Sequence, residues 1–177
     1  MDVSETGYGV ALLNDCKYGH NVIDDTIKIT AIKCGRWPND VDDRGKHVFT
    51  YSLLPHIGSY CESGVIHEAY KLNQPLMVCP VTDVSGDLEN ELSFVSCDKE
   101  NIIIETVKKA ENDDSLIVRM YDCFDAKTNV TVTVMDGYKK AYICDLLENS
   151  TEELEIIDNK VTVPVSNFEI VTLKFEN

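Results

Sequence analysis

The fold of this chain is constrained most by a repeated alternation of apolar and polar residues with a period of two. Such alternation indicates β-strands that bury one face in a core and expose the other. The alternating segments are residues 26–33, 48–53, 130–134 and 171–175. Their predicted apolar faces are Ile27, Ile29 and Ala31; Phe49, Tyr51 and Leu53; Val130, Val132 and Val134; and Val171, Leu173 and Phe175. β-branched and aromatic residues dominate these positions, as is usual in strands.

Turn-forming residues separate these segments. They lie at residues 35–40 (GRWPND), 42–45 (DDRG), 111–114 (ENDD) and 136–137 (DG). Short strands joined by polar turns are typical of antiparallel sandwiches rather than of alternating strands and helices. We therefore predict a mainly β protein, built as an antiparallel β-sandwich.

One segment has the spacing of a helix instead. In residues 62–72, Val65, Ile66 and Ala69 recur at helical intervals. Because a proline disfavours helical geometry in the residue before it, the helix is predicted to end near Asn73, ahead of Pro75. The sequence thus predicts a single short helix.

The chain is predicted to hold two domains, residues 1–82 and 83–177. Apolar density drops over residues 80–90, where Pro, Ser, Gly and Asp accumulate. We expect about four strands and the helix before this point, and six or seven strands after it. A sheet with so few strands exposes edges and an apolar face. The first domain is therefore expected to pack on the second or to form a homo-oligomer.

The charge of the chain excludes two classes of partner. Its 16 basic residues are outnumbered by 31 acidic ones, for a net charge of −15. Nucleic-acid binding depends on clustered lysines and arginines, and anionic membranes attract the same residues, so neither partner is expected. No apolar run approaches the ~20 residues of a membrane-spanning helix, and residues 1–10 lack the features of a secretory signal.

The cysteines and histidines predict neither a disulfide framework nor a metal site. Seven cysteines are spread almost evenly without a CxxC pair, and four histidines form no HxH or HExxH arrangement. Reduced and mostly buried thiols are the better interpretation, which favours a cytoplasmic protein. We expect no metal and no cofactor in this chain.

No catalytic site of its own is expected either. The adjacent carboxylates Asp24–Asp25, Asp42–Asp43 and Asp113–Asp114 lie in turn contexts, where adjacent side chains point apart. A GxSxG nucleophile motif is absent, and the GYG at residues 7–9 lacks the spacing of a nucleotide-binding loop.

Two polar clusters are candidates for contacts with a ligand or with another domain. The first follows the apolar residues 10–13 and consists of Asn14, Asp15, Lys17, Tyr18 and His20. Its side chains could hold sugar hydroxyls or neutralise a carboxylate, and the alternative is a local turn beside a solvated lysine.

The second cluster is Asp43, Arg44 and His47, near Tyr51 and His56. Arg44 could pair with a carboxylate and fix domain packing. Trp37 could stack on a sugar, although a single tryptophan more often fills a packing gap.

Four segments resemble the C-terminal region of the family 38 glycoside hydrolases, the retaining α-mannosidases. They are GYGVALLNDCKYGH (residues 7–20), DRGKHVFTYSLLPH (43–56), ENIIIETVKKAENDDSLIVRMYD (100–122) and SNFEIVTLKFEN (166–177). By this resemblance, residues 1–82 are the end of the family's galactose-mutarotase-like supersandwich domain, and residues 83–177 are its terminal β-sandwich.

The resemblance also implies a function. In the family, zinc and the catalytic carboxylates belong to an N-terminal barrel domain, which no segment here resembles. The chain would then be a non-catalytic C-terminal β-region that packs on the catalytic domain and shapes its cleft for mannosides. A basic residue after a strand reaches toward the active site in the family, which points to Lys17. The alternative is a self-standing carbohydrate-binding sandwich, which the presence of only one tryptophan disfavours.

Overall fold

The computed structural model describes residues 1–39, 41, 43–82, 85–87 and 89–177. They form two compact units, unit 1 (Met1–Val81) and unit 2 (Thr82–Asn177). Every strand pairing in them is antiparallel, and the described residues contain one α-helix. The prediction of a mainly β, antiparallel fold with one short helix is confirmed.

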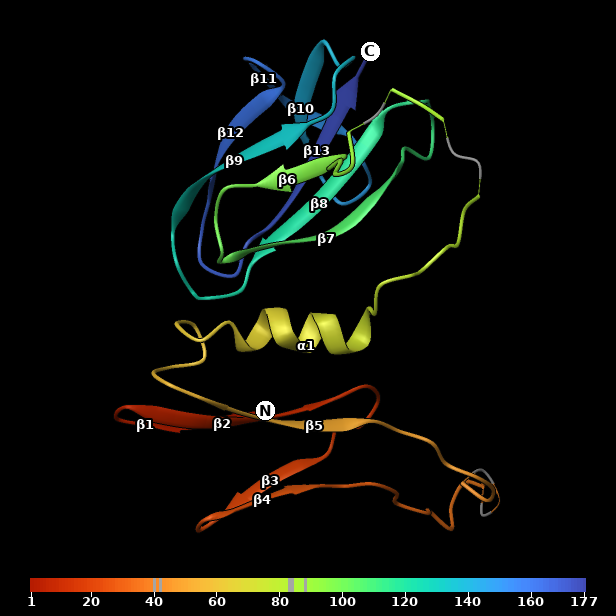
Figure 1. Cartoon of the computed structure of the whole chain (residues 1–177), viewed down its shortest axis with the longest axis vertical. Coiled ribbons are helices and arrows are strands. Elements are labelled where there is room, and N and C mark those ends of the chain that lie inside the picture. The colour runs from red at the N-terminus through yellow and green to blue at the C-terminus, as the bar shows by residue number, and fades with distance from the viewer. Residues whose placement is uncertain (40, 42, 83–84, 88) are drawn as a thin grey trace. The chain divides into compact units, whose positions relative to one another are not determined.

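Unit 1 contains five described strands rather than the four predicted (Figure 1). Its elements are β1 (Asp2–Glu5), β2 (Tyr8–Asn14), β3 (His20–Ile23), β4 (Thr26–Ile29), β5 (Tyr51–His56) and α1 (Val65–Asn73). β2 is the central strand of a sheet with the order β1-β2-β5, and β3 and β4 form a separate hairpin. Asp24 and Asp25 make the two-residue turn of that hairpin, and Asp24 adopts a φ of 52°. Asp and Asn tolerate this left-handed geometry better than most residues, so the predicted turn role of this pair is confirmed.

The helix α1 covers one face of the β1-β2-β5 sheet. Ala11 and Leu13 of β2 form a small core with Val65 of α1, and Leu54 packs against it. The helix begins three residues later than the predicted residue 62, because Gly64 adopts a φ of 66° that an α-helix cannot include. It ends at Asn73, as predicted.

Unit 2 is a two-layer sandwich of eight described strands, compared with six or seven predicted (Figure 1). They are β6 (Val95–Cys97), β7 (Ile102–Lys109), β8 (Leu116–Asp122), β9 (Thr128–Val134), β10 (Lys140–Cys144), β11 (Ser150–Leu154), β12 (Lys160–Val165) and β13 (Ile170–Glu176). One sheet has the order β11-β10-β13-β8-β7, and the other has the order β12-β9-β6.

The core of unit 2 comes from the inward face of both sheets. Val130, Val132 and Val134 of β9 are 0–3% exposed, and Leu173 and Phe175 of β13 are fully buried. These residues alternate with polar ones along their strands, so the faces predicted for residues 130–134 and 171–175 are confirmed. Burial of these apolar side chains supplies the main stabilisation of the sandwich.

A buried carboxylate ties three segments of unit 2 together. Asp122, at the end of β8, is 0% exposed and accepts hydrogen bonds from the side chain of Asn101 (2.6 Å) and from the backbone N–H groups of Ala126 (3.0 Å) and Phe168 (2.9 Å). Desolvation by burial raises the pKa of Asp122, but the hydrogen bonds, led by that from Phe168 N–H, outweigh it and leave the pKa below its usual value.

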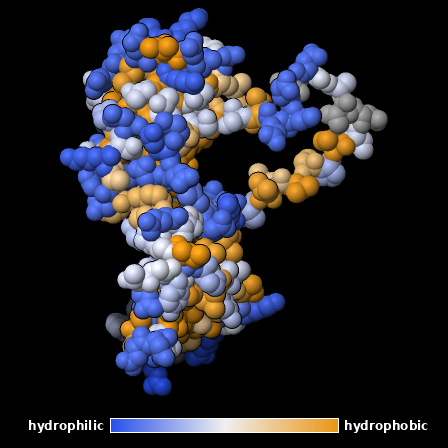
Figure 2. Space-filling model, turned by 60° about the vertical axis from the view of Figure 1, so that its left-hand side comes forward, coloured by the Kyte–Doolittle hydropathy of each residue, from blue (hydrophilic) through white to orange (hydrophobic). Residues whose placement is uncertain are grey.

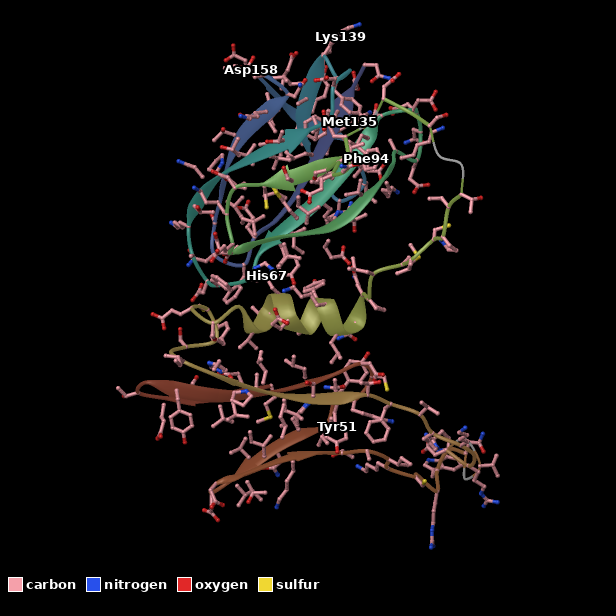
Figure 3. The ribbon with its side chains drawn as sticks, in the orientation of Figure 1. Tyr51, His67, Phe94, Met135, Lys139 and Asp158 are labelled. Atoms are coloured by element: carbon pink, nitrogen blue, oxygen red, sulfur yellow. The ribbon has the colours of Figure 1, made fainter. Side chains whose placement is uncertain are left out.

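The prediction for residues 48–53 is only partly right. Residues 48–50 precede the strand, and Tyr51 and Leu53, predicted to face a core, are 61% and 60% exposed. The register places Leu54 opposite Ala11, so Leu54 faces α1 while Tyr51 extends on the opposite side of the sheet (Figure 3). Alternation identifies which residues share a face, but it does not determine which face of the strand the helix covers.

Besides Tyr51 and Leu53, further exposed apolar residues lie in the extended segment after α1. Leu76, Met77 and Val78 are 96%, 98% and 91% exposed, and hydrophobic residues can be followed along this segment in Figure 2. Cys79 in the same segment is also exposed.

The prediction of mostly buried cysteines is therefore wrong. Cys123 and Cys144 are buried, Cys61 and Cys97 are half-buried, and the remaining three are exposed: Cys16, Cys34 and Cys79. Apolar neighbours in sequence bury a cysteine only where the segment itself is packed, and the segment that contains Cys79 is not. All seven are free thiols.

Candidate functional site

The structure brings all five residues of the first predicted cluster around one hollow at the end of β2. The hollow has a volume of about 500 Å³. Its lining residues are Asn14, Asp15, Cys16, Lys17, Tyr18, His20 and Asn73. We call it the Lys17 hollow; all of these residues belong to unit 1.

Asn14 builds the turn that forms the hollow. Its Oδ1 accepts hydrogen bonds from the backbone N–H groups of Cys16 (3.2 Å) and Lys17 (2.5 Å). These bonds turn the chain sharply after β2, as asparagine side chains commonly do. Asn73 of α1 donates from Nδ2 to the carbonyl of Asn14 (3.2 Å), which fixes the turn against the helix.

Asp15 joins the turn to the residue before β5. Its N–H donates to the carbonyl of Thr50 (3.2 Å), and its Oδ2 accepts from the N–H of Thr50 (2.9 Å). The hydrogen bond from Thr50 is the largest of the effects that lower the pKa of Asp15 below its usual value. The carboxylate of Asp15 is therefore a structural acceptor in this turn.

Lys17 lies over an aromatic ring instead of extending into solvent. Its Nζ is 4.9 Å from the centroid of the Phe49 ring, a cation–π distance. Tyr18, the next residue, is 95% exposed. The hollow therefore presents one held ammonium group beside one free phenol.

His20 closes the cluster through both ring nitrogens. Nδ1 lies 3.0 Å from the carbonyl of Tyr18, and Nε2 lies 3.3 Å from Nδ2 of Asn14. Since a carbonyl oxygen only accepts, Nδ1 carries the proton, and Nε2 accepts from the Asn14 amide when the ring is neutral. Asn14, Asp15 and His20 thus shape the hollow, whereas Lys17 and Tyr18 keep hydrogen-bonding groups for a ligand.

Three contributors to the hollow were missed by sequence reasoning: Phe49, Thr50 and Asn73. The first two precede β5, and the third is the last residue of α1. A cation opposite an aromatic ring leaves no signal in a single sequence when the two are 32 positions apart. The only available signal was that Phe49 lies within one of the four segments that resemble the family.

The second predicted cluster is only partly assembled. Asp43 and Arg44 line a hollow together with Cys34, Gly35 and Arg36. His47, which is not part of that lining, is bound to the same loop by a contact of 2.8 Å between Nε2 and the carbonyl of Asp43. The predicted role of this cluster in domain packing stays a prediction, and Asp42 lies outside the described residues.

Trp37 does not fill a packing gap within the described residues. Its side chain is 87% exposed, in the loop between β4 and β5. The packing interpretation is therefore wrong for this chain by itself, and the sugar-stacking interpretation stays open as a prediction.

The carboxylates of the third predicted pair serve as anchors of the loop between β7 and β8. Asp113 accepts from Nζ of Lys174 (2.6 Å) and from the N–H of Ser115 (2.9 Å), and Lys174 is the largest cause of its lowered pKa. Lys109 pairs with Asp114.

Two further features are absent from the part of the chain that the structure describes. No three His, Cys, Asp or Glu side chains there come close enough together to hold a metal ion. No helix within that part is both long and apolar enough to cross a membrane.

The amino-acid sequence of this chain is similar to that of one protein family. The model of the glycosyl hydrolases family 38 C-terminal beta sandwich domain matches residues 101–173, all in unit 2. Alpha-mannosidase 2C1 of Homo sapiens is 35% identical over 98% of this chain and 17% of its own length. Alpha-mannosidase G of Dictyostelium discoideum is also 35% identical, over 98% of this chain and 16% of its own length.

The fold agrees with a solved structure as well. A family 38 glycosyl hydrolase from Enterococcus faecalis superposes with a TM-score of 0.78 at 21% identity, over 99% of this chain and 22% of its own. The chain thus spans less than a quarter of the length of each of these proteins. Residues 101–173 carry the C-terminal β-sandwich domain of glycosyl hydrolase family 38, and 98% of the chain is similar to proteins named alpha-mannosidase.

Proposed function

We propose that this chain is the non-catalytic C-terminal β-region of an α-mannosidase, which hydrolyses terminal α-mannosides through a separate catalytic domain. The carrying observation is that two proteins named alpha-mannosidase match 98% of the chain at 35% identity within only 16–17% of their own length. By the resemblance to the family, zinc and the catalytic carboxylates belong to the catalytic domain. The role of the chain is to pack on that domain and to shape the rim of its cleft.

The Lys17 hollow is the proposed part of that rim. Lys17 offers an ammonium donor and Tyr18 an exposed phenol, and both suit the hydroxyl groups of a sugar or a carboxylate of the catalytic domain. Asn14 and Asp15 support them through backbone hydrogen bonds and are not proposed to contact substrate.

Activity measurements test both parts of the proposal. The chain by itself, with zinc or cobalt added, should not hydrolyse an aryl α-mannoside, while the longer protein that includes the catalytic domain should. In that protein, Lys17→Met, which keeps the length of the side chain and removes its charge, should lower kcat/KM about tenfold, as loss of a charged hydrogen bond does. Lys139→Met, on the surface of unit 2 (Figure 3), is the matched control.

Two results would count against the proposal. Turnover by the chain alone would mean that it contains its own catalytic residues. Unchanged kinetics of the Lys17→Met variant would remove the Lys17 hollow from the cleft, although the chain could still pack on the catalytic domain.

A self-standing carbohydrate-binding module is the second candidate. Exposed Trp37 and Tyr18 favour it, because exposed aromatic side chains stack on sugar rings. Trp37 is the only tryptophan, so its fluorescence reports binding directly. Quenching by methyl α-mannoside that saturates at millimolar concentration would favour this candidate, and a flat titration would favour the first.

We also propose that the protein works in the cytoplasm. Its free cysteines support this location, since exposed thiols without a disulfide partner are usual in a reducing compartment.

A further inference from the structure

We infer that Phe49 is a positioning residue that holds the Lys17 ammonium group in place over the Lys17 hollow. The inference rests on the proposed function, because it concerns the same hollow, but the contact itself can be tested without any activity. It would give the hollow an oriented cation whose donors all remain free for oxygen atoms of a ligand.

The first observation is the environment of the ammonium group. Lys17 Nζ lies 4.9 Å from the ring centroid of Phe49, and both side chains are half-buried. No carboxylate of a described residue forms an ion pair with Lys17. Within the described structure, the aromatic ring is therefore what directs this lysine.

The second observation is that the backbone around Phe49 holds its ring in a defined position. The β2–β5 ladder has Asn14 opposite Tyr51, and the hydrogen bonds between Asp15 and Thr50 extend it by one residue beyond the strands. Phe49 is the next residue along this extended ladder. Its ring lies 6.4 Å from the ring of Tyr51, so it is supported along the strand as well.

The chemistry of the contact explains why a ring serves better here than a carboxylate. A carboxylate would take up one or two of the ammonium donors and neutralise the charge. The face of an aromatic ring attracts the cation through its quadrupole and uses no donor. Lysine otherwise loses much rotamer entropy when a ligand orders it, and a lysine that is already ordered avoids part of that cost.

Nuclear magnetic resonance of the 177-residue chain tests the contact directly. Protons above an aromatic ring move upfield, so the ε-methylene protons of Lys17 should be shifted upfield from those of the other lysines. The shift should disappear in Phe49→Leu and remain in Phe49→Tyr, which keeps the ring. Phe94→Leu, at an aromatic residue of unit 2 that is 61% exposed, is the matched control and should leave the shift unchanged.

Kinetics of the longer protein test the consequence. Phe49→Leu should raise KM for the aryl mannoside about three- to fivefold with little change in kcat, which is the size expected for one cation–π contact. Phe49→Tyr should restore KM, whereas a merely structural role would lower thermal stability and kcat together.

The outcomes separate this inference from the proposed function. Absence of the upfield shift in the unmodified chain overturns the inference, whatever the kinetics of Lys17→Met. A normal KM in Phe49→Leu, with a raised KM in Lys17→Met, also overturns it and leaves the proposed function intact. An upfield shift with no kinetic effect of Lys17→Met supports the contact and removes the hollow from the cleft.

Discussion

The imidazole of His56 crosses the central strand of the unit 1 sheet to reach Asp2, with Nε2 of His56 2.7 Å from Oδ1 of Asp2. His56 ends β5 and Asp2 begins β1, so the two edge strands of the sheet are linked directly over β2. Gly9 of β2 is opposite His56, and a β-carbon there would lie 2.4 Å from Cε1 of the ring. The missing side chain of Gly9 is what allows the ring to cross.

The substitution Gly9→Ala should therefore destabilise unit 1. The added methyl group would also lie 2.8 Å from Cβ of Ser4, so neither neighbouring strand leaves room for it. Overpacking of this kind costs about 1–3 kcal/mol. Faster hydrogen exchange of the Ala11 and Leu54 amides would show the loss. Gly86→Ala, in unit 2 with open space around it and no positive φ, should leave those two amides unchanged.

The substitution His56→Ala should weaken the same sheet for a different reason. The side chain of His56 is 4% exposed and that of Asp2 is 14% exposed, so removal of the imidazole leaves Oδ1 of a largely buried carboxylate without its donor, while Oδ2 keeps the hydroxyl of Ser4 (2.8 Å). Loss of a hydrogen bond to a charged group costs about 1.5–3 kcal/mol. In the double variant Asp2→Ala and His56→Ala, the loss should be smaller than the sum of the two single losses. Additive losses would show that the pair is not coupled.

The substitution Asp122→Asn should destabilise unit 2 by about 3 kcal/mol, because an amide group cannot accept every bond that the buried carboxylate accepts. Urea unfolding would measure the change in the free energy of unfolding. Hydrogen exchange of amides in β8 and β13 would show that the loss lies in unit 2. Asp158→Asn is the matched control, since Asp158 is an exposed turn residue of the same unit (Figure 3) with a φ of 51° that asparagine also tolerates. Equal stability of the two variants would contradict this account of Asp122.

The contribution of Asp122 should also depend on pH. Its pKa is below the usual 3.8 in the folded protein, so the folded state prefers the ionised form. The stabilisation is complete above pH ~5, where the unfolded carboxyl is almost fully ionised, and it is lost as the pH falls through the folded pKa. The difference in unfolding free energy between the wild type and Asp122→Asn should shrink as the pH is lowered from about 5. A difference that stayed constant over this range would contradict the lowered pKa.

Labelling with a maleimide should divide the cysteines by exposure. Cys34 and Cys79 are expected to react first, and Cys123 and Cys144 only after unfolding. Cys16 is exposed, but the hydrogen bond with the carboxylate of Asp15 raises its pKa, so less of the reactive thiolate is present. It should react more slowly than Cys34 at pH 8, and peptide mass spectrometry would rank the labelling rates of the three exposed cysteines. Asp15→Ala should remove the delay, and equal rates in the unmodified chain would contradict it.

Much of the fold could be predicted because it depends on local patterns. The period of two places Val130, Val132 and Val134 on one buried face, and Asp24–Asp25 forms its turn through residues that tolerate a positive φ. The end of α1 at Asn73 follows from Pro75. In each case the physical cause lies within a few residues of the feature, so a single sequence contains it.

The candidate site was predictable only in its contiguous part. The turn after β2 places Asn14, Lys17 and Tyr18 near one another because they are close in sequence. Phe49 and Asn73 join them through the strand register and the docking of α1, which are set by packing between distant segments.

The sequence by itself determined the mainly β class, the alternation of residues 130–134 and 171–175, the single helix, and the similarity to the family 38 segments. Only the tertiary structure decided which face of β5 packs on α1, which ring lies beneath Lys17, and that His56 reaches Asp2 across Gly9. The physical reason is that alternation and turn propensity are short-range properties of the chain. Register, burial and side-chain partners between residues 32 to 54 positions apart depend on how whole elements pack together.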